Sequence, residues 1–247
     1  MNNFLRLTAL AFLSAIFFSS CEKDDDETQC EPAVIAEKSL SLDFEFNAAD
    51  APFQYDEVYT INGIAVSFDE IRFYLSDFVL HDDAENMESI EAFLLLDAGA
   101  SNNTFTIGET ELDHIHELHM LLGLNDVVNH QDPIVADAPL NDASMHWGWN
   151  PDAGYKFVKV ECMADTDADG TPDSAVSMHV ATDALSRAVE VEVHQSGENN
   201  SNEIALTVDI EDIFENIDLS TVGTSHGGTQ VNGALATNLA GAFDLVD

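Results

Sequence analysis

The chain has 247 residues, of which 47 are acidic and seven basic, so its formal net charge is −40 at pH 7. Such a surface repels phosphate backbones and excludes nucleic acid as a partner. The length is sufficient for one domain with a well-filled core. Three cysteines are too few for a zinc ribbon.

The N-terminus has the pattern of a bacterial lipoprotein signal peptide. Arg6 precedes an apolar run from Leu7 to Phe18 that is too short to span a bilayer as a permanent helix. The run ends in Phe18-Ser19-Ser20-Cys21, which resembles a lipobox and makes Cys21 the lipidated first residue of the mature chain. We therefore predict a signal peptide over residues 1–20 and a lipid anchor that holds the protein to a membrane outside the cytoplasm.

An acidic segment follows the predicted anchor. Residues 22–27 are Glu, Lys, Asp, Asp, Asp and Glu, a composition too polar to fold. We predict a hydrated tether over residues 21–37. The run also resembles the acidic signal that sends lipoproteins of the Bacteroidota to the cell surface, so we expect the protein at the outer membrane or the cell surface, as a monomer.

Residues 38–247 are predicted to form one mainly β domain. Apolar and polar residues alternate from Leu40 to Phe46 with the period of a half-buried strand, and Asn62-Gly63 is a strong hairpin signal. Only residues 210–217 have a helical pattern. The pattern favours an antiparallel β-sandwich or open barrel with long loops and one short helix. Further strands are predicted over residues 58–61, 64–80, 93–96, 104–107, 115–124, 155–162, 176–180, 188–194 and 204–208.

The loop over residues 125–142 is rich in Asn, Asp and Pro, and loops of this length inside a compact domain are usually functional. It leads to Met145-His146-Trp147-Gly148-Trp149-Asn150, which holds both tryptophans of the chain. Tryptophan marks packing or recognition, and His and Met are donors that suit copper. The alternative is a core tryptophan pair beside an incidental histidine.

Nine histidines outnumber the lysines. His114, His116 and His119 cluster on one predicted strand, His179 follows Met178 on another, and His226 precedes two glycines. A metal site assembled from separate strands would draw one histidine from each, because neutral imidazole is the commonest ligand for copper-like ions. The residues alone leave open which of these histidines converge.

A second candidate metal site has carboxylates at alternate positions. Asp165, Asp167, Asp169 and Asp173 surround Gly170, as in a calcium loop in which glycine allows a sharp bend. The twelfth position is Val176, so the closing acid of an EF-hand is missing. We predict a structural calcium ion here, with an acidic hairpin turn as the alternative.

Two cysteines remain besides Cys21. An oxidising compartment permits a disulfide between Cys30 and Cys162, which would staple the tether to the domain. The alternative is two unpaired thiols. The chain has no nucleophile-elbow or phosphate-loop frame, and we expect no enzymatic activity.

The tryptophan motif, with Gly154-Tyr155-Lys156-Phe157 after it, resembles the MbnP-like family. These are secreted copper-binding proteins related to the methanobactin-operon protein MbnP and to the copper-repressible surface proteins of methane oxidisers. Residues 39–47, 71–76 and 238–243 support the likeness, which covers about residues 39–247. The resemblance implies a β-rich fold and a mononuclear copper site with histidine ligands. It also implies that Trp147 or Trp149 is oxidised to kynurenine by a di-haem peroxidase-like partner, MbnH.

These observations predict a surface- or periplasm-facing lipoprotein that binds copper for acquisition, storage or buffering. Histidines from different strands would hold the ion, namely His116, His179 and His226 with His146. An oxidised tryptophan would tune the site or supply a weak ligand, and Met145 or Met178 nearby would favour Cu(I). The alternative is a non-metal binding or adhesion module in which Trp147 and Trp149 form an aromatic platform for glycans.

Overall fold

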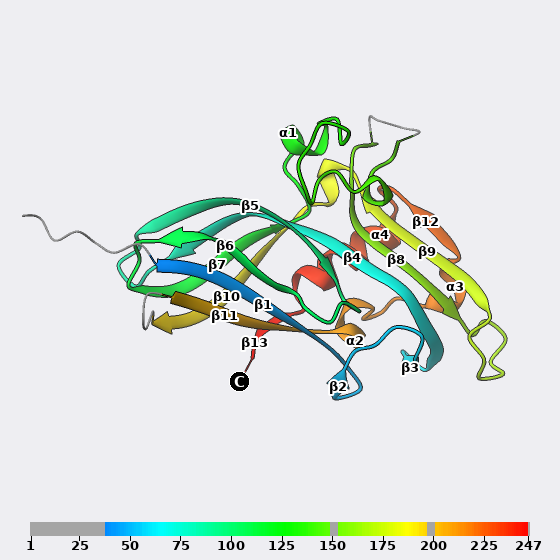
Figure 1. Ribbon diagram of the computed structural model, residues 1–247. Helices are drawn as coiled ribbons and strands as arrows, with labels where there is room; N and C mark the ends of the chain where they lie inside the picture. Colours follow the sequence, from blue (N-terminus) through cyan, green and yellow to red (C-terminus); the bar gives the residue numbers. More distant parts are fainter. Residues whose placement is uncertain (1–37, 149–152, 197–200, 247) are drawn as a thin grey trace, which may run out of the picture. The chain divides into compact units, whose positions relative to one another are not determined.

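The structure is a computed structural model that describes residues 38–148, 153–196 and 201–246 (Figure 1). The predicted signal peptide and tether, with Cys21 and Cys30, lie outside these residues, as does Trp149. The first strand among the described residues is β1, which begins at Lys38. No helix among the described residues is both long and apolar enough to cross a membrane.

The smaller sheet is built around β1 (Lys38–Ala48). On one side β1 pairs in parallel with β11 (Ser201–Asp209), which in turn pairs with β13 (Phe243–Leu245). On the other side β1 pairs antiparallel with β6 (Thr104–Thr110) and β2 (Ala51–Pro52). The apolar residues of β1 alternate as predicted, and Leu40 and Leu42 are fully buried.

The larger sheet is organised by one long strand, β4 (Ile64–His81), which changes partners along its length. One edge of β4 pairs first with β8 (Lys156–Ala164) and then with β7 (His114–Leu122). The other edge pairs first with β3 (Val58–Ile61) and then with β5 (Met87–Asp97). The sheet continues outward through β10 (Arg187–Ser196) beyond β7, and through β9 (Ser174–Ala181) and β12 (Thr224–His226) beyond β8.

The two sheets enclose one apolar core, in which aromatic rings meet edge to face. Phe46 of the smaller sheet contacts Phe73 of the larger one with ring centroids 6.0 Å apart, and Phe243 contacts both Phe44 and Phe73. The sandwich predicted from the sequence is therefore confirmed. Two strand pairs differ from the antiparallel expectation: β1 with β11, and β9 with β12, are parallel.

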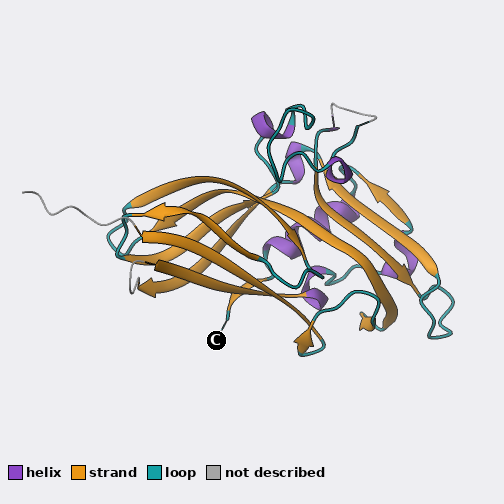
Figure 2. Ribbon diagram, in the orientation of Figure 1, coloured by secondary structure: helices purple, strands orange, loops and turns teal. Residues whose placement is uncertain are grey.

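The helical part of the domain was under-predicted (Figure 2). The helix predicted over residues 210–217 is shorter in the structure, where α2 spans Ile210–Ile213. The helix α4 (Gln230–Ala240) was not predicted, because Gly, Asn and Thr give its sequence a weak helical propensity. Its buried residues Asn232, Leu235, Ala236 and Leu239 have the spacing of one helix face, and the side chain of Thr229 caps its first turn. The α-helices are α1 (Asp126–Asn129), α2 (Ile210–Ile213), α3 (Leu219–Val222) and α4 (Gln230–Ala240), and short 3-10 turns are η1 (Ala143–Met145) and η3 (Asp183–Leu185).

We predict that Gly123→Ala destabilises the protein by about 2–5 kcal/mol, because it combines backbone strain with overpacking. Gly123 has a φ of +108°, and a Cβ there would lie 2.7 Å from the buried ring of Phe157. Gly63→Ala is the matched control, since Gly63 has a φ of +83° with open space around it. Urea unfolding should show a much smaller loss for Gly63→Ala, and equal losses would contradict the packing argument.

Candidate metal centre

Two histidines lie side by side on the larger sheet. His179 on β9 and His226 on β12 are direct partners across a parallel strand pair, so their side chains emerge on the same face. Their imidazole rings are stacked, with centroids 4.4 Å apart and planes inclined by 3°. The fold therefore brings together two of the four histidines predicted to bind copper.

The short strand β12 is held against β9 by a buried amide. Asn232 of α4 is fully buried, and its Nδ2 donates to the carbonyl oxygens of His179 (2.9 Å), Gly227 (2.8 Å) and Ser225 (3.2 Å). The backbone N–H of Gly227 also donates to the His179 carbonyl at 2.9 Å. Asn232 is therefore the residue that fixes the register of His226 against His179.

His179 is oriented by a carboxylate. Its Nε2 lies 2.6 Å from Glu161 Oε1 and 3.2 Å from Ser177 Oγ, and the Nε2 of His226 lies 3.3 Å from the same hydroxyl. Within the described part of the chain, Nδ1 of His179 is enclosed and has no hydrogen-bond partner. Histidines that ligate metals commonly donate their other ring N–H to a carboxylate, so this environment fits a ligand that offers Nδ1.

Burial lowers the pKa of His179, although the hydrogen bond that its Nε2–H donates to Glu161 acts to raise it. The short contact with Glu161 alone would suggest an imidazolium ion. We favour the lowered pKa because the His179 side chain is only 10 % exposed and Lys156 and His226 add positive potential. A neutral imidazole at physiological pH is the form that binds a metal ion.

Trp147 contacts both imidazoles, of which His179 is buried and His226 is exposed. Its ring centroid lies 5.4 Å from that of His179 and 5.2 Å from that of His226, and the residue is 6 % exposed. Its backbone N–H donates to the Gly154 carbonyl at 3.0 Å. The Nζ atom of Lys156 lies 4.9 Å from the Trp147 ring centroid and donates to the Ser144 carbonyl at 2.6 Å. The indole and the imidazoles thus form one compact group.

His146 lies apart from this group. It is in an extended conformation next to Trp147, so the two side chains point in opposite directions. Its ring packs edge-on against Tyr155 with centroids 4.9 Å apart, and it lines a cavity with His130 and Asp132. The structure thus gives the motif histidine a different environment from His179 and His226.

His116 lies apart as well. His116 is next to Glu117 of β7, which pairs with His81 of β4. His179 of β9 pairs with Lys159 of β8, and Lys159 pairs with Arg72 of β4. The distance between His81 and Arg72 along β4 therefore indicates how far apart the two histidines are. His81 and Arg72 are nine positions apart on β4, which is roughly 30 Å at about 3.3 Å per residue. His116 therefore does not join the centre at Trp147.

The methionines predicted as soft donors are turned into the core. Met178 is next to His179 in the sequence, and strand alternation sends its side chain to the opposite face, where it is fully buried. Met145 is fully buried in the same core. Donors at the centre are therefore nitrogen and oxygen atoms.

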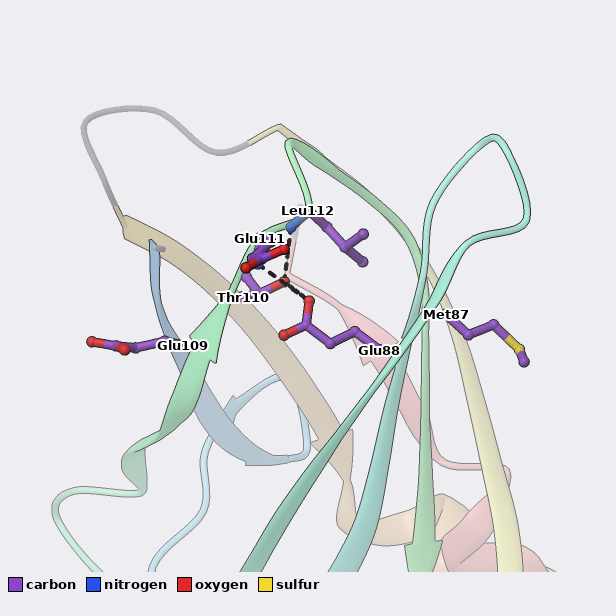
Figure 3. Close-up of a pocket in the computed structure, with 6 residues that line it drawn as sticks. All are labelled: Met87, Glu88, Glu109, Thr110, Glu111 and Leu112. Atoms are coloured by element: carbon purple, nitrogen blue, oxygen red, sulfur yellow. Dashed lines mark hydrogen bonds between the residues drawn. The ribbon is translucent and has the colours of Figure 1, made fainter. Parts of the chain in front are cut away.

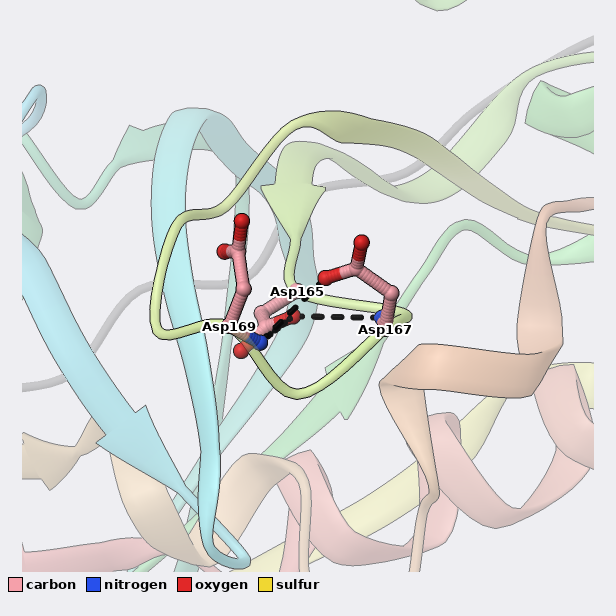
Figure 4. Close-up of side chains that lie close together, drawn as sticks. All are labelled: Asp165, Asp167 and Asp169. Atoms are coloured by element: carbon pink, nitrogen blue, oxygen red, sulfur yellow. Dashed lines mark hydrogen bonds between the residues drawn. The ribbon is translucent and has the colours of Figure 1, made fainter.

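The predicted calcium loop joins β8 to β9 (Figure 4). Ligand atoms of Asp165, Asp167 and Asp169 lie within 4.8 Å of one another. Asp165 also accepts hydrogen bonds from four backbone N–H groups, of residues 167 to 170, which lower the pKa of its carboxyl. Asp173 instead accepts a hydrogen bond from Ser174. Calcium binding stays a prediction.

The predicted disulfide also stays a prediction, because Cys30 lies outside the described residues. Cys162 is buried in the core on β8, and burial raises the pKa of its thiol to about 12. A thiol in this position is inert, because the reactive form is the thiolate.

Sequence reasoning missed Glu161, Ser177, Lys156 and Asn232. The sequence did contain a signal for Glu161 and Ser177. The acidic turn around residue 169 fixes the β8–β9 hairpin, and in that hairpin Ser177 is the partner of Glu161. Ser177 and His179 then share a face by strand alternation. No comparable signal marked Asn232, because its role depends on the packing of a helix that the sequence pattern did not predict.

This geometry defines a class of protein: a two-sheet β-sandwich that carries a histidine pair under a buried tryptophan. The sequence profile of the MbnP family matches residues 37–231, and the chain belongs to this family. Among solved structures, MbnP from Methylosinus trichosporium is similar, with a TM-score of 0.55 and 19% identity over 76% of this chain and 83% of that one. No curated protein shows a significant sequence match.

We predict that His179 makes the stability of the protein depend on pH. Because its folded pKa lies below the ordinary value of about 6.5, the unfolded chain binds more protons at acidic pH, and stability falls as the pH falls through that value. In metal-free protein, urea unfolding between about pH 7 and pH 5 should show a steeper loss for the wild type than for His179→Gln. Parallel curves would contradict a lowered pKa.

Proposed function

We propose that this protein is a lipid-anchored, copper-binding member of the MbnP family that acts in acquisition, storage or buffering of copper and has no catalytic turnover. Cys21 would carry the lipid and place the domain at the outer membrane or cell surface. His179 and His226 would hold the ion beside Trp147.

The observation that carries this proposal is the environment of His179. One ring nitrogen is held by Glu161, and the other is enclosed without a partner among the described residues. A buried polar atom left unsatisfied costs free energy, which a bound metal ion would recover. The ring of His226 would supply the second nitrogen donor after it rotates out of the parallel stack, because an imidazole lone pair lies in the ring plane. Imidazole donors suit copper, and Cu(II) binds such sites more tightly than other divalent first-row ions.

The surrounding charges support selectivity. Three of the seven basic residues of the chain lie near the site: Lys156 and Lys159 on β8, which carries Glu161, and Arg72 on the adjoining strand β4. Arg72 is paired with Asp142 at 2.6 Å and Lys159 with Glu70. These contacts occupy the carboxylates next to the centre, so few free oxygen ligands remain there for a hard cation such as Ca²⁺. A metal ion that prefers nitrogen ligands does not need these carboxylates.

Trp147 is the tryptophan that we propose for conversion to kynurenine, because its ring contacts both imidazoles. The oxidising equivalents would come from a di-haem peroxidase-like partner of the MbnH type. Such a modification beside the histidines would add a polar group to the centre. The burial of Trp147 also argues against the aromatic platform, since an indole that is 6 % exposed has no open face on which a sugar could stack.

We predict that His179→Ala and His226→Ala each weaken the binding of copper at this centre by at least ~10-fold, and that Glu161→Gln weakens it by about 10–100-fold through misorientation of His179. The measurement is competition titration with Cu(I) and Cu(II) chelators in buffer that contains millimolar calcium. His130→Ala is the control, because His130 is an exposed histidine paired with Asp183 outside the centre. Equal affinities in His130→Ala and His179→Ala would refute the assignment.

We predict that protein isolated from its native host carries an oxidised indole at position 147. Intact-mass and peptide mass spectrometry should locate the modification in the peptide with Trp147, and Trp147→Phe should abolish it. Protein expressed without the di-haem partner serves as the unmodified control. An unmodified Trp147 in host-derived, copper-loaded protein would remove this part of the proposal.

A further inference from the structure

A second group of histidines lies at the other end of the larger sheet, where the β4–β5 hairpin, the start of β7 and the end of β10 meet (Figure 1). His116 and His194 have their Nδ1 atoms 3.0 Å apart, with ring centroids separated by 4.4 Å. His81 and His119 stack beside them with centroids 4.3 Å apart. Five of the nine histidines of the chain belong to this group, with His114 as the fifth.

The convergence depends on an irregularity in β10. The register between β10 and β7 shifts between Glu192 and Gln195, and His194 within that bulge has a φ of +49°. Bulges re-aim side chains, and a positive φ is costly for a non-glycine residue. The strained backbone at His194 brings its ring to His116, as expected at a functional position.

Asp83 of the β4–β5 hairpin adds oxygen donors. Its Oδ1 lies 3.3 Å from His116 Nδ1, and its Oδ2 lies 2.9 Å from His114 Nδ1. Nδ1 of His114 is enclosed, and its contact with Asp83 lacks hydrogen-bond geometry. This nitrogen therefore has no hydrogen-bond partner among the described residues. A cavity of about 730 Å³ lined in part by His81, Asp83 and His116 opens beside them.

The neighbouring cavity in Figure 3 has a different chemistry. Its six lining residues include no histidine, and the Glu88 carboxylate there already accepts hydrogen bonds from Thr110 Oγ1 (2.6 Å) and the Glu111 N–H (3.2 Å). The donors that suit a transition metal are thus on the His116 side of this end of the sheet.

We propose that His116 and His194 form a second, solvent-accessible Cu(II) site, with the Asp83 carboxylate as a third ligand. Metal–nitrogen bonds of about 2.0–2.1 Å place two adjacent nitrogen ligands about 3 Å apart, which is the separation of the two Nδ1 atoms. The donor atoms of Asp83, His116 and His194 do not all lie within 4.8 Å of one another. The Asp83 side chain is 67 % exposed, so it is able to turn toward the pair.

The choice of Cu(II) follows from the donors. Two imidazoles and one carboxylate form a mixed nitrogen and oxygen set, which suits tetragonal Cu(II), and Cu(II) leads the affinity order of divalent first-row ions. The side chains of His116 and His194 are 33 % and 57 % exposed, so an ion there is open to solvent on both ligands, whereas an ion at the first centre would be bound to the His179 side chain, which is 10 % exposed. This site does not depend on the proposed function of His179 and His226.

The test is Cu(II) titration of the full-length protein by electron paramagnetic resonance and calorimetry, in buffer with excess calcium to occupy carboxylates. The wild type should bind two equivalents with distinct spectra. His116→Ala/His194→Ala should lose the exchangeable equivalent alone, and His179→Ala/His226→Ala should lose the other alone. His130→Ala, the matched surface control, should retain both.

Each remaining outcome is decisive. If the double variant His116→Ala/His194→Ala binds as many equivalents of Cu(II) as His130→Ala, with an unchanged spectrum, the second site is refuted. The contact between His116 and His194 is then only a hydrogen bond between two imidazoles. If only the spectrum from the exchangeable site appears, and His179→Ala/His226→Ala leaves it intact, the second site stands and the proposed function fails. Circular dichroism and thermal unfolding of the exposed His116 and His194 variants exclude misfolding as the cause of a lost equivalent.

Discussion

The centre depends on one hydrogen-bonding side chain, the amide of Asn232. By donating to three backbone carbonyls it joins α4, β12 and β9, and so holds a strand of three residues in parallel register against the edge of the larger sheet. A strand this short has little pairing energy of its own. A shift of one residue would turn His226 to the other face and separate it from His179. The imidazole stack and the contact of His226 with Trp147 follow from that fixed register, whereas the contact of His179 with Glu161 is set by the β8–β9 hairpin.

Electrostatics explains how an acidic protein can hold a selective centre. With 47 carboxylates the whole surface attracts cations, so net charge gives no discrimination between calcium and copper. The proposed discrimination requires a location where a nitrogen donor is buried and the neighbouring carboxylates are already paired. The larger sheet supplies it, because Lys156 packs on Trp147 and Arg72 and Lys159 hold adjacent acids. Burial then keeps His179 neutral, at the cost of making the folded state sensitive to acid.

Local patterns were sufficient for the sheets and insufficient for the site. Alternation in β1 and the Asn62-Gly63 turn predicted strands and a hairpin, because both depend on neighbouring residues only. Which histidines converge depends instead on register between distant strands, and on bulges such as the one at His194. Sequence proximity was therefore misleading: His146 adjoins Trp147 and Met178 adjoins His179, yet alternation turns both away. The parallel pairing of β12 and the packing of α4 are long-range features that leave little trace in composition.

The burial of Trp147 restricts how that indole can react. The indole is 6 % exposed, and its ring contacts both imidazoles and the ammonium group of Lys156. A large protein reagent therefore has little of the ring available for direct contact. Electrons would have to leave the indole by tunnelling through the atoms packed around it. The rate of oxidation of Trp147 would then be set by the length of that tunnelling path.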